Sequence, residues 1–149
     1  MKKAFLLGLG VIVLFAFAPV AFAQTVLKDG TYRLEEKNYD HGYRVVFEII
    51  VKKGKITKVN YDNVNDKGGS KTKDNAYQAS MKKVNGLGPK EFIPRLAKNF
   101  QKVQDPAKID IITGASHSSE SFKAYAEKLV EAAQNGDTTP IIIENEVSG

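Results

Sequence analysis

Near the start of the chain, apolar and polar side chains alternate with the period of two that is typical of β-strands. Residues 30–36 form a short stretch of this kind, and residues 43–51 form a longer one. The apolar positions on one side of the longer stretch are Val45, Phe47, Ile49 and Val51. Residues 52–55 contain a glycine and are read as a turn into a third strand, which carries Ile56, Val59 and Tyr61. The pattern predicts a hairpin and an antiparallel sheet.

After a polar loop over residues 63–74, the apolar spacing changes to three and four residues, the period of an α-helix. The first helix is short and amphipathic, with Tyr77, Met81 and Val84 on its apolar side. A second helix is predicted within residues 89–103, and because Pro94 disturbs it, its regular part is expected to begin only there. A third helix ends at Asn135-Gly136. Its apolar positions are Phe122, Tyr125, Ala126, Leu129, Val130 and Ala133.

Two short apolar runs complete the expected fold. Residues 108–112 are predicted as a buried strand, and residues 141–143 as an edge strand within a C-terminal tail over residues 137–149. The pattern as a whole predicts a single α+β domain, in which an antiparallel sheet with a β-hairpin packs against about three helices. The length of 149 residues suits one domain, expected over residues 24–149 with its core at about 29–136.

The first 23 residues have the three parts of a secretory signal peptide. Lys2 and Lys3 form a basic start, an apolar run covers residues 4–18, and Ala21-Phe22-Ala23 is a small–x–small site. Cleavage is expected between Ala23 and Gln24, which places the mature protein outside the cytoplasm, in the periplasm or secreted. An uncleaved anchor is the alternative, although the apolar run is short of the roughly 20 residues that a spanning helix needs.

Composition removes several classes of function. The chain has no cysteine, which excludes disulfide scaffolds, thiol nucleophiles and cysteine-ligated metals. Its two histidines, His41 and His117, are too few for a histidine-rich metal site. Formal net charge is +5, and two of the basic residues lie in the predicted leader. The remaining excess of positive charge is too small to indicate a nucleic-acid partner.

The segment with the clearest chemistry, here called the motif turn, covers residues 110–117. Small residues, Gly114 and Ala115, lie between a β-rich run and a helix, so another molecule can approach the backbone closely. Thr113, Ser116 and the serines that follow add hydroxyl groups. The first N–H groups of a helix lack partners within it, and its dipole is positive there, which favours phosphate. The alternative is that the hydroxyl residues only cap the helix.

The run Asp-Ile-Ile-Thr-Gly-Ala-Ser over residues 110–116 resembles the attachment motif of the FMN-binding domain family, Asp-x-x-[Ser/Thr]-Gly-Ala-[Thr/Ser]. Residues 29–32, 54–59 and 118–123 are similar to the family as well, and the chain is closest in kind to small exported members related to a bacterial membrane immunogen. In that family the last hydroxyl residue takes FMN through a phosphoester bond. A separate magnesium-dependent flavin transferase makes the bond from FAD outside the cytoplasm. Many relatives are lipoproteins, but this leader ends without a cysteine.

The resemblance implies a role for each residue of the motif turn. Ser116 would be the attachment oxygen, at a position where threonine is usual. Asp110 and Thr113 would help the transferase to recognise the turn, while Gly114 and Ala115 keep it compact. His117 is left between two roles, a donor to the phosphate and a solvated residue at the helix start. No metal ligand and no catalytic residue is assigned.

Together with the leader, this resemblance implies an exported, membrane-associated flavoprotein that carries electrons between a donor and an acceptor in the cell envelope. An electron carrier is favoured over an enzyme with a substrate of its own, because no catalytic acid or base stands out. The alternative from another class is a flavin-free surface or binding protein on the same scaffold, since a fold does not fix a function.

Overall fold

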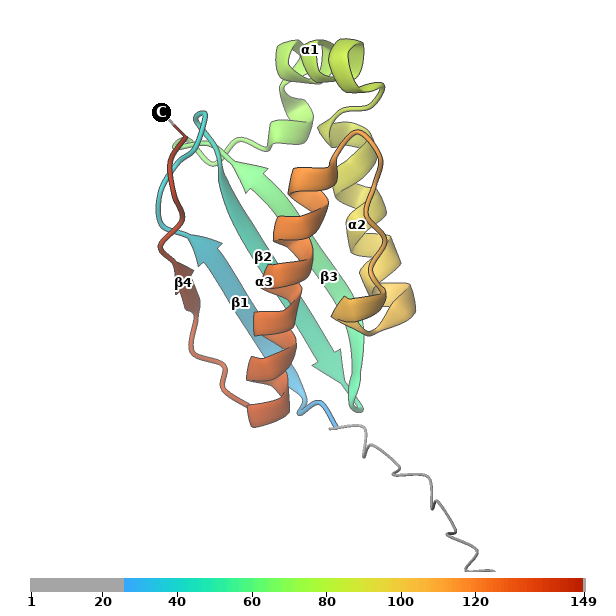
Figure 1. Cartoon of the computed structure of the whole chain (residues 1–149). Coiled ribbons are helices and arrows are strands. Elements are labelled where there is room, and N and C mark those ends of the chain that lie inside the picture. Colours follow the sequence, from blue (N-terminus) through green and yellow to red (C-terminus); the bar gives the residue numbers. More distant parts are fainter. Residues whose placement is uncertain (1–25, 149) are drawn as a thin grey trace, which may run out of the picture.

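Four strands form one sheet in the order β3-β2-β1-β4 (Figure 1). They are β1 (Gly30–Glu36), β2 (Arg44–Lys52), β3 (Lys55–Val64) and β4 (Ile141–Ile143). The first three are antiparallel neighbours, whereas β4 runs parallel to β1. The structure is a computed structural model that describes residues 26–148. The predicted signal peptide and its cleavage site lie outside the described residues.

The hairpin of β2 and β3 confirms the alternating pattern. All four apolar positions predicted on one side of β2 are buried. Lys53 and Gly54 have φ angles of 51° and 73°. Two positive φ angles in a two-residue turn match the twist of the strands that the turn connects. The pairing shifts between Ile50 and Val51, so that Thr57 has no opposite residue. This bulge explains why Ile56 and Val59, three residues apart, are both buried.

Three α-helices and two short 3-10 helices complete the domain. They are η1 (Lys71–Lys73), α1 (Asn75–Asn85), α2 (Pro89–Val103), η2 (Pro106–Lys108) and α3 (Ser116–Asn135). Helix α3 crosses one face of the sheet, and α2 lies alongside it over β3 (Figure 1). The α+β class is therefore confirmed, with a sheet that is mixed because of β4.

The core between the helices and the sheet is rich in aromatic rings. Phe122 of α3 is fully buried, and its ring centroid lies 4.6 Å from that of Phe47 and 4.7 Å from that of Tyr61. Phe100 of α2 completes the group at 5.9 Å from Phe122. Because Phe122 stands in the second turn of α3, this packing fixes the beginning of α3 against the sheet.

Two predicted elements differ in the structure. The segment 108–112 is not a strand: it forms the end of η2 and an extended stretch outside the sheet. Ile109 and Ile112 are buried there, and apolar composition alone cannot distinguish such a buried stretch from a strand. Helix α2 is continuous from Pro89, so the expected late start at Pro94 is wrong. Pro94 lacks the N–H that would donate to the carbonyl of Lys90, but the helix continues through this position.

Helix α1 only partly confirms the predicted apolar side: Met81 packs against the core and the ring of Tyr77 lies against that of Tyr43. Gln78 is the residue it buries, whereas Val84 is 80% exposed. The helix stands away from the sheet at one end of the domain (Figure 1). Its ends are well capped, because the Asp74 carboxylate accepts the N–H of Tyr77 and Gly86 adopts a left-handed conformation.

Both ends of the described chain are hydrogen-bonded to the domain. At the start, the N–H of Lys28 donates to the carbonyl of Ala133, near the C-terminal end of α3 (2.8 Å). In the tail, Asn145 exchanges three hydrogen bonds with Asn38, in the loop after β1. No helix within residues 26–148 is long and apolar enough to cross a membrane.

Candidate functional site

The motif turn joins the extended segment to the first residue of α3. The N–H of Ala115 donates to the carbonyl of Ile112 at 2.9 Å, which closes the turn. Gly114 has a φ of 87°, a conformation that residues with a Cβ rarely adopt. Helix α3 then begins at Ser116. The structure thus confirms the sharp turn of small residues, although the segment before it is not a strand.

Gly114 is also required because of its neighbours. A Cβ atom at this position would lie 2.5 Å from the carbonyl oxygen of Asn85 and 3.2 Å from Cδ2 of Leu87. These two residues belong to the junction between α1 and α2. The motif turn therefore packs directly against this junction, a contact that no pattern in the sequence predicts.

One hydroxyl of the predicted cluster has a structural role. Ser119 is fully buried, and its Oγ accepts the N–H of Ile112 at 3.0 Å while donating to the carbonyl of Ala115 at 2.8 Å. The side chain thus holds both ends of the turn. Ser119 therefore has a structural role and is not available to a ligand, but it does not cap α3, because neither bond involves one of the first N–H groups of that helix.

The N-terminus of α3 remains open. Among residues 26–148, no side chain accepts a hydrogen bond from its first N–H groups, and its first turn contains no acidic residue. The side chains of Ser116 and His117 are exposed. The other two α-helices differ: Asp74 caps α1, and Gln78 accepts the N–H of Lys90 in the first turn of α2. Uncapped N–H groups beside an exposed hydroxyl suit a phosphate group.

Asp110 and Thr113 are both exposed at the same turn. The N–H of Asp110 donates to Oδ1 of Asn99 at 2.9 Å, and Nδ2 of Asn99 donates to Oδ2 of Asp110 at 3.2 Å. Asn99 lies on α2. Sequence reasoning missed this partner, because no spacing rule connects a helix residue to an extended segment eleven residues later.

Asp110 also lines a hollow of about 460 Å³ along α2, here called the α2 hollow. Three exposed basic side chains line the same hollow: Arg95, Lys98 and Lys102. Among residues 26–148, none of the three forms an ion pair. The surface beside the motif turn therefore combines this basic row with two carboxylates, those of Asp110 and Glu91.

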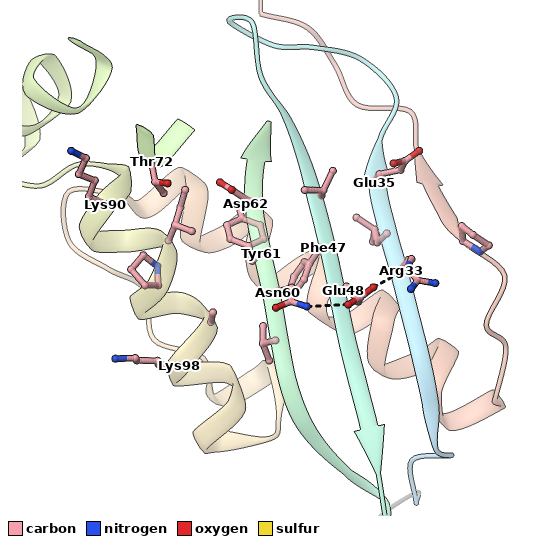
Figure 2. A pocket seen from close by; sticks show the side chains of 17 residues that line it. Arg33, Glu35, Phe47, Glu48, Asn60, Tyr61, Asp62, Thr72, Lys90 and Lys98 are labelled. Carbon is pink, nitrogen blue, oxygen red and sulfur yellow. Dashed lines mark hydrogen bonds and ion pairs between the residues drawn. The ribbon is translucent and has the colours of Figure 1, made fainter. Parts of the chain in front are cut away.

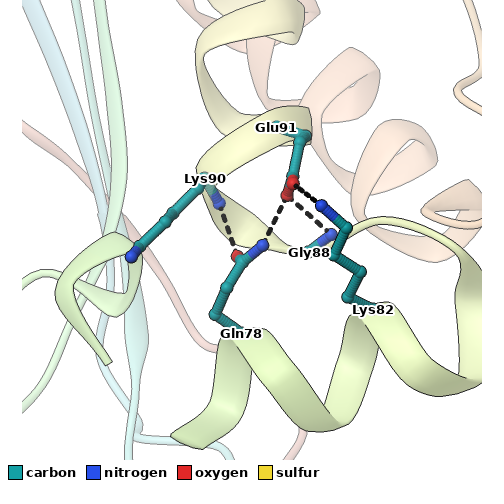
Figure 3. Close-up of polar contacts among 5 residues, drawn as sticks. All are labelled: Gln78, Lys82, Gly88, Lys90 and Glu91. Carbon is teal, nitrogen blue, oxygen red and sulfur yellow. Dashed lines mark hydrogen bonds and ion pairs between the residues drawn. The ribbon is translucent and has the colours of Figure 1, made fainter. Parts of the chain in front are cut away.

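A polar cluster fixes the α1–α2 junction behind the turn (Figure 3). The Glu91 carboxylate accepts hydrogen bonds from Nε2 of Gln78 (2.6 Å), Nζ of Lys82 (3.0 Å) and the N–H of Gly88 (2.9 Å). These donors favour the charged form and lower the pKa of Glu91 to about 2, with the Gln78 bond as the largest cause. A rigid junction gives the motif turn a fixed surface to pack on.

A larger hollow lies elsewhere, between α2 and the open face of the sheet (Figure 2). Its volume is about 1050 Å³. In its floor, Glu48 accepts hydrogen bonds from Arg33 of β1 and Asn60 of β3. No residue of the motif turn lines this hollow. Within residues 26–148, no three side chains of metal-ligand type lie together.

Comparisons with known proteins show the family of this chain. The family model of the FMN-binding domain matches residues 41–131, a range that contains the whole motif turn. The "15 kDa lipoprotein" of Treponema pallidum (strain Nichols) is 31% identical over 117 residues, which are 78% of this chain and 83% of that protein. A crystal structure of a protein from Clostridium perfringens is 39% identical and covers 80% of this chain and 99% of its own, with a TM-score of 0.75. The chain therefore belongs to the FMN-binding domain family, and FMN is the cofactor that its domain binds.

Proposed function

We propose that this protein is an exported electron carrier whose FMN is attached through a phosphoester bond to Oγ of Ser116. FMN supplies the redox chemistry, while the protein holds the cofactor and tunes its potential. The observation that carries the proposal is the open start of α3. An exposed hydroxyl stands at the first helical position, beside N–H groups that no side chain caps.

The residues of the motif turn fit a phosphate at this place. The helix end favours a negative charge by roughly 0.3–1 kcal/mol, which helps to orient the phosphate but cannot by itself retain a flavin. Thr113 and His117 are exposed close to Ser116 in the sequence and are candidate donors to the phosphate oxygens. A covalent bond at Ser116 would supply the retention that these contacts lack.

The proposed bond forms in a balanced exchange catalysed by a magnesium-dependent flavin transferase. A new bond joins Ser116 Oγ to the phosphorus atom of the FMN half of FAD, and the pyrophosphate bond of FAD breaks. AMP leaves, and the proton of the serine hydroxyl passes to solvent. The exposure of Ser116 allows an enzyme to reach this oxygen.

Co-expression with a flavin transferase tests the attachment. We compare the wild type with Ser116→Ala, Ser116→Thr and, as a matched control, Ser118→Ala. Flavin fluorescence on a denaturing gel and the intact mass are measured for each. The wild type, Ser116→Thr and Ser118→Ala are expected to gain the mass of one FMN less one water, and Ser116→Ala is expected to gain nothing.

The outcomes separate the alternatives. Flavin on Ser116→Ala would place the attachment at another residue. Flavin that is lost from the wild type on denaturation would indicate non-covalent binding. A colourless wild type, from cells in which a known substrate of the transferase is modified, would favour a flavin-free surface or binding protein.

Export is part of the proposal and has its own test. The leader pattern supports it, and so does the relative named as a lipoprotein, a class of protein that is held at the cell envelope. We expect the mature chain to begin at Gln24 and to occur in an extracytoplasmic fraction. N-terminal sequencing of the protein from its own host checks this, and full-length chain in the cytoplasm would contradict it.

A further inference from the structure

We propose that Asn99 is a positioning residue, which holds the carboxylate of Asp110 in the orientation that the flavin transferase recognises. The inference rests on the proposed function, because it concerns how the motif turn is presented for modification. It assigns a role to a residue outside the motif, on a different element of the fold.

The contact between the two residues is reciprocal. Oδ1 of Asn99 accepts the backbone N–H of Asp110, and Nδ2 of Asn99 donates to Oδ2 of the same residue. A side-chain amide carries an acceptor and a donor side by side, so it matches a backbone N–H and a carboxylate together. The pair therefore fixes the backbone of Asp110 and the direction of its side chain at the same time.

Asp110 depends on this contact because no strand holds it. The segment that contains it lies outside the sheet, so it has no ladder of hydrogen bonds. The neighbouring Ile109 and Ile112 are anchored by burial, while Asp110 points to solvent. An exposed carboxylate without a partner would sample several rotamers. An enzyme that recognises only one rotamer would then bind more weakly, because fixing the side chain costs conformational entropy.

Asn99, the partner of Asp110, is neutral, although basic side chains lie nearby. Arg95, Lys98 and Lys102 line the same hollow as Asp110, yet none forms an ion pair with it among the described residues. Asn99 thus orients the carboxylate without neutralising it. The negative charge stays available to whatever docks on the motif turn.

The test is a kinetic double-mutant cycle with purified protein, transferase, FAD and Mg²⁺. The variants are Asn99→Ala, Asp110→Ala and their combination, with kcat and KM measured for flavin transfer. Gln101→Ala is the matched control: it lies on the same helix and donates one hydrogen bond, to the carbonyl of Thr57, away from the motif turn. Thermal unfolding of each variant shows whether it is folded.

Asn99→Ala is expected to lower kcat/KM about tenfold, mainly through KM, in line with coupling energies between contacting residues. In the Asp110→Ala background the same change is expected to cost less than twofold, because the residue it positions is gone. Asn99→Asp has nearly the same shape and keeps the acceptor for the N–H of Asp110, but it sets one carboxylate against another. It is expected to lose at least as much as Asn99→Ala while remaining folded.

Equal kinetics for Asn99→Ala and the wild type would overturn the positioning role and leave Ser116 attachment intact. Additive losses in the cycle, or an equal loss in Gln101→Ala, would also overturn it, since they would indicate a general effect of α2. A wild type that takes no flavin would instead reject the proposed attachment, and the inference with it.

Discussion

The carbonyl oxygen of Asn85 lies 2.5 Å from the point where a side chain on Gly114 would begin. Gly114→Ala is therefore expected to destabilise the fold for two reasons: the position has a positive φ, and the new Cβ would clash with backbone. The clash term should cost about 1–3 kcal/mol, the usual range for overpacking. Urea unfolding measures the free energy, and flavin incorporation is expected to fall because the turn must shift.

Gly68→Ala provides the control for this prediction. Gly68 has a similar φ of 76°, but no atom of the described residues lies within 4 Å of the position where its Cβ would be. Gly68→Ala should therefore lower the free energy of unfolding only by the conformational cost of a positive φ, about 1–2 kcal/mol. If the two variants lose the same free energy of unfolding, the contact between Gly114 and Asn85 does not constrain the turn.

Ser119→Ala is expected to destabilise the protein by about 1–3 kcal/mol, because the buried N–H of Ile112 would lose its acceptor. Ser118 is half-buried and has no hydrogen-bonded side-chain partner in the described part of the chain, so Ser118→Ala should change the free energy of unfolding by less than about 0.5 kcal/mol. Thermal or urea unfolding of both variants distinguishes the two serines. Similar losses would show that Ser119 does not hold the turn.

The pH dependence of stability should contain a contribution from Glu91. Its folded-state pKa of about 2 is below the ordinary value of 4.5. Between these two pH values the Glu91 carboxylate therefore binds a proton more readily in the unfolded chain than in the folded one. The stabilisation is complete above about pH 4.5 and is lost as the pH falls towards 2. Unfolding in urea at a series of pH values measures it.

Glu91→Gln isolates that contribution. Asp29, Asp74 and Asp137 also have lowered pKa values, so the variant will still lose stability in acid. The difference in unfolding free energy between wild type and variant is expected to shrink as the pH falls from 4.5 to 2. A constant difference over this range would mean that the hydrogen bonds to Glu91 do not depend on its charge.

Truncation of the central aromatic ring tests the core. Phe122→Ala is expected to cost about 3–5 kcal/mol in the free energy of unfolding, the usual loss for a buried phenylalanine. Val84→Ala is the contrasting change, because Val84 is 80% exposed and should contribute less than about 0.5 kcal/mol. A large loss from Val84→Ala would mean that α1 packs against something beyond the described residues.

Period and turn chemistry were sufficient to predict most of the fold. The strand over residues 30–36, the buried side of β2 and the end of α3 near Gly136 all agree with the pattern. These elements pack on one face, so the burial of each side chain follows the local period. The strand predicted over residues 108–112 is wrong because Ile109 and Ile112 join the core from outside the sheet, and composition alone does not distinguish such a segment from a buried strand.

The motif turn itself could be predicted from the sequence, but its contacts with other parts of the fold could not. Ser116 and Gly114 stand where the motif indicated, and the open start of α3 follows from their order in the chain. The contacts of the turn with Asn85 and Asn99 come from elements far along the chain. A pattern of hydroxyl residues does not show which of them faces the interior, so the sequence alone does not distinguish the buried Ser119 from the exposed Ser116.

The hydrogen bond from Lys28 to Ala133 has a practical consequence for experiments in which the protein is attached to a solid surface. Ala133 and Ser116 lie near opposite ends of α3, a helix of 20 residues and thus about 30 Å long. A tether joined ahead of Val26 therefore meets the domain at the pole away from Ser116 (Figure 1). Protein immobilised on an electrode through such a tether would present the motif turn to the solution, where a soluble partner can reach it but the electrode cannot.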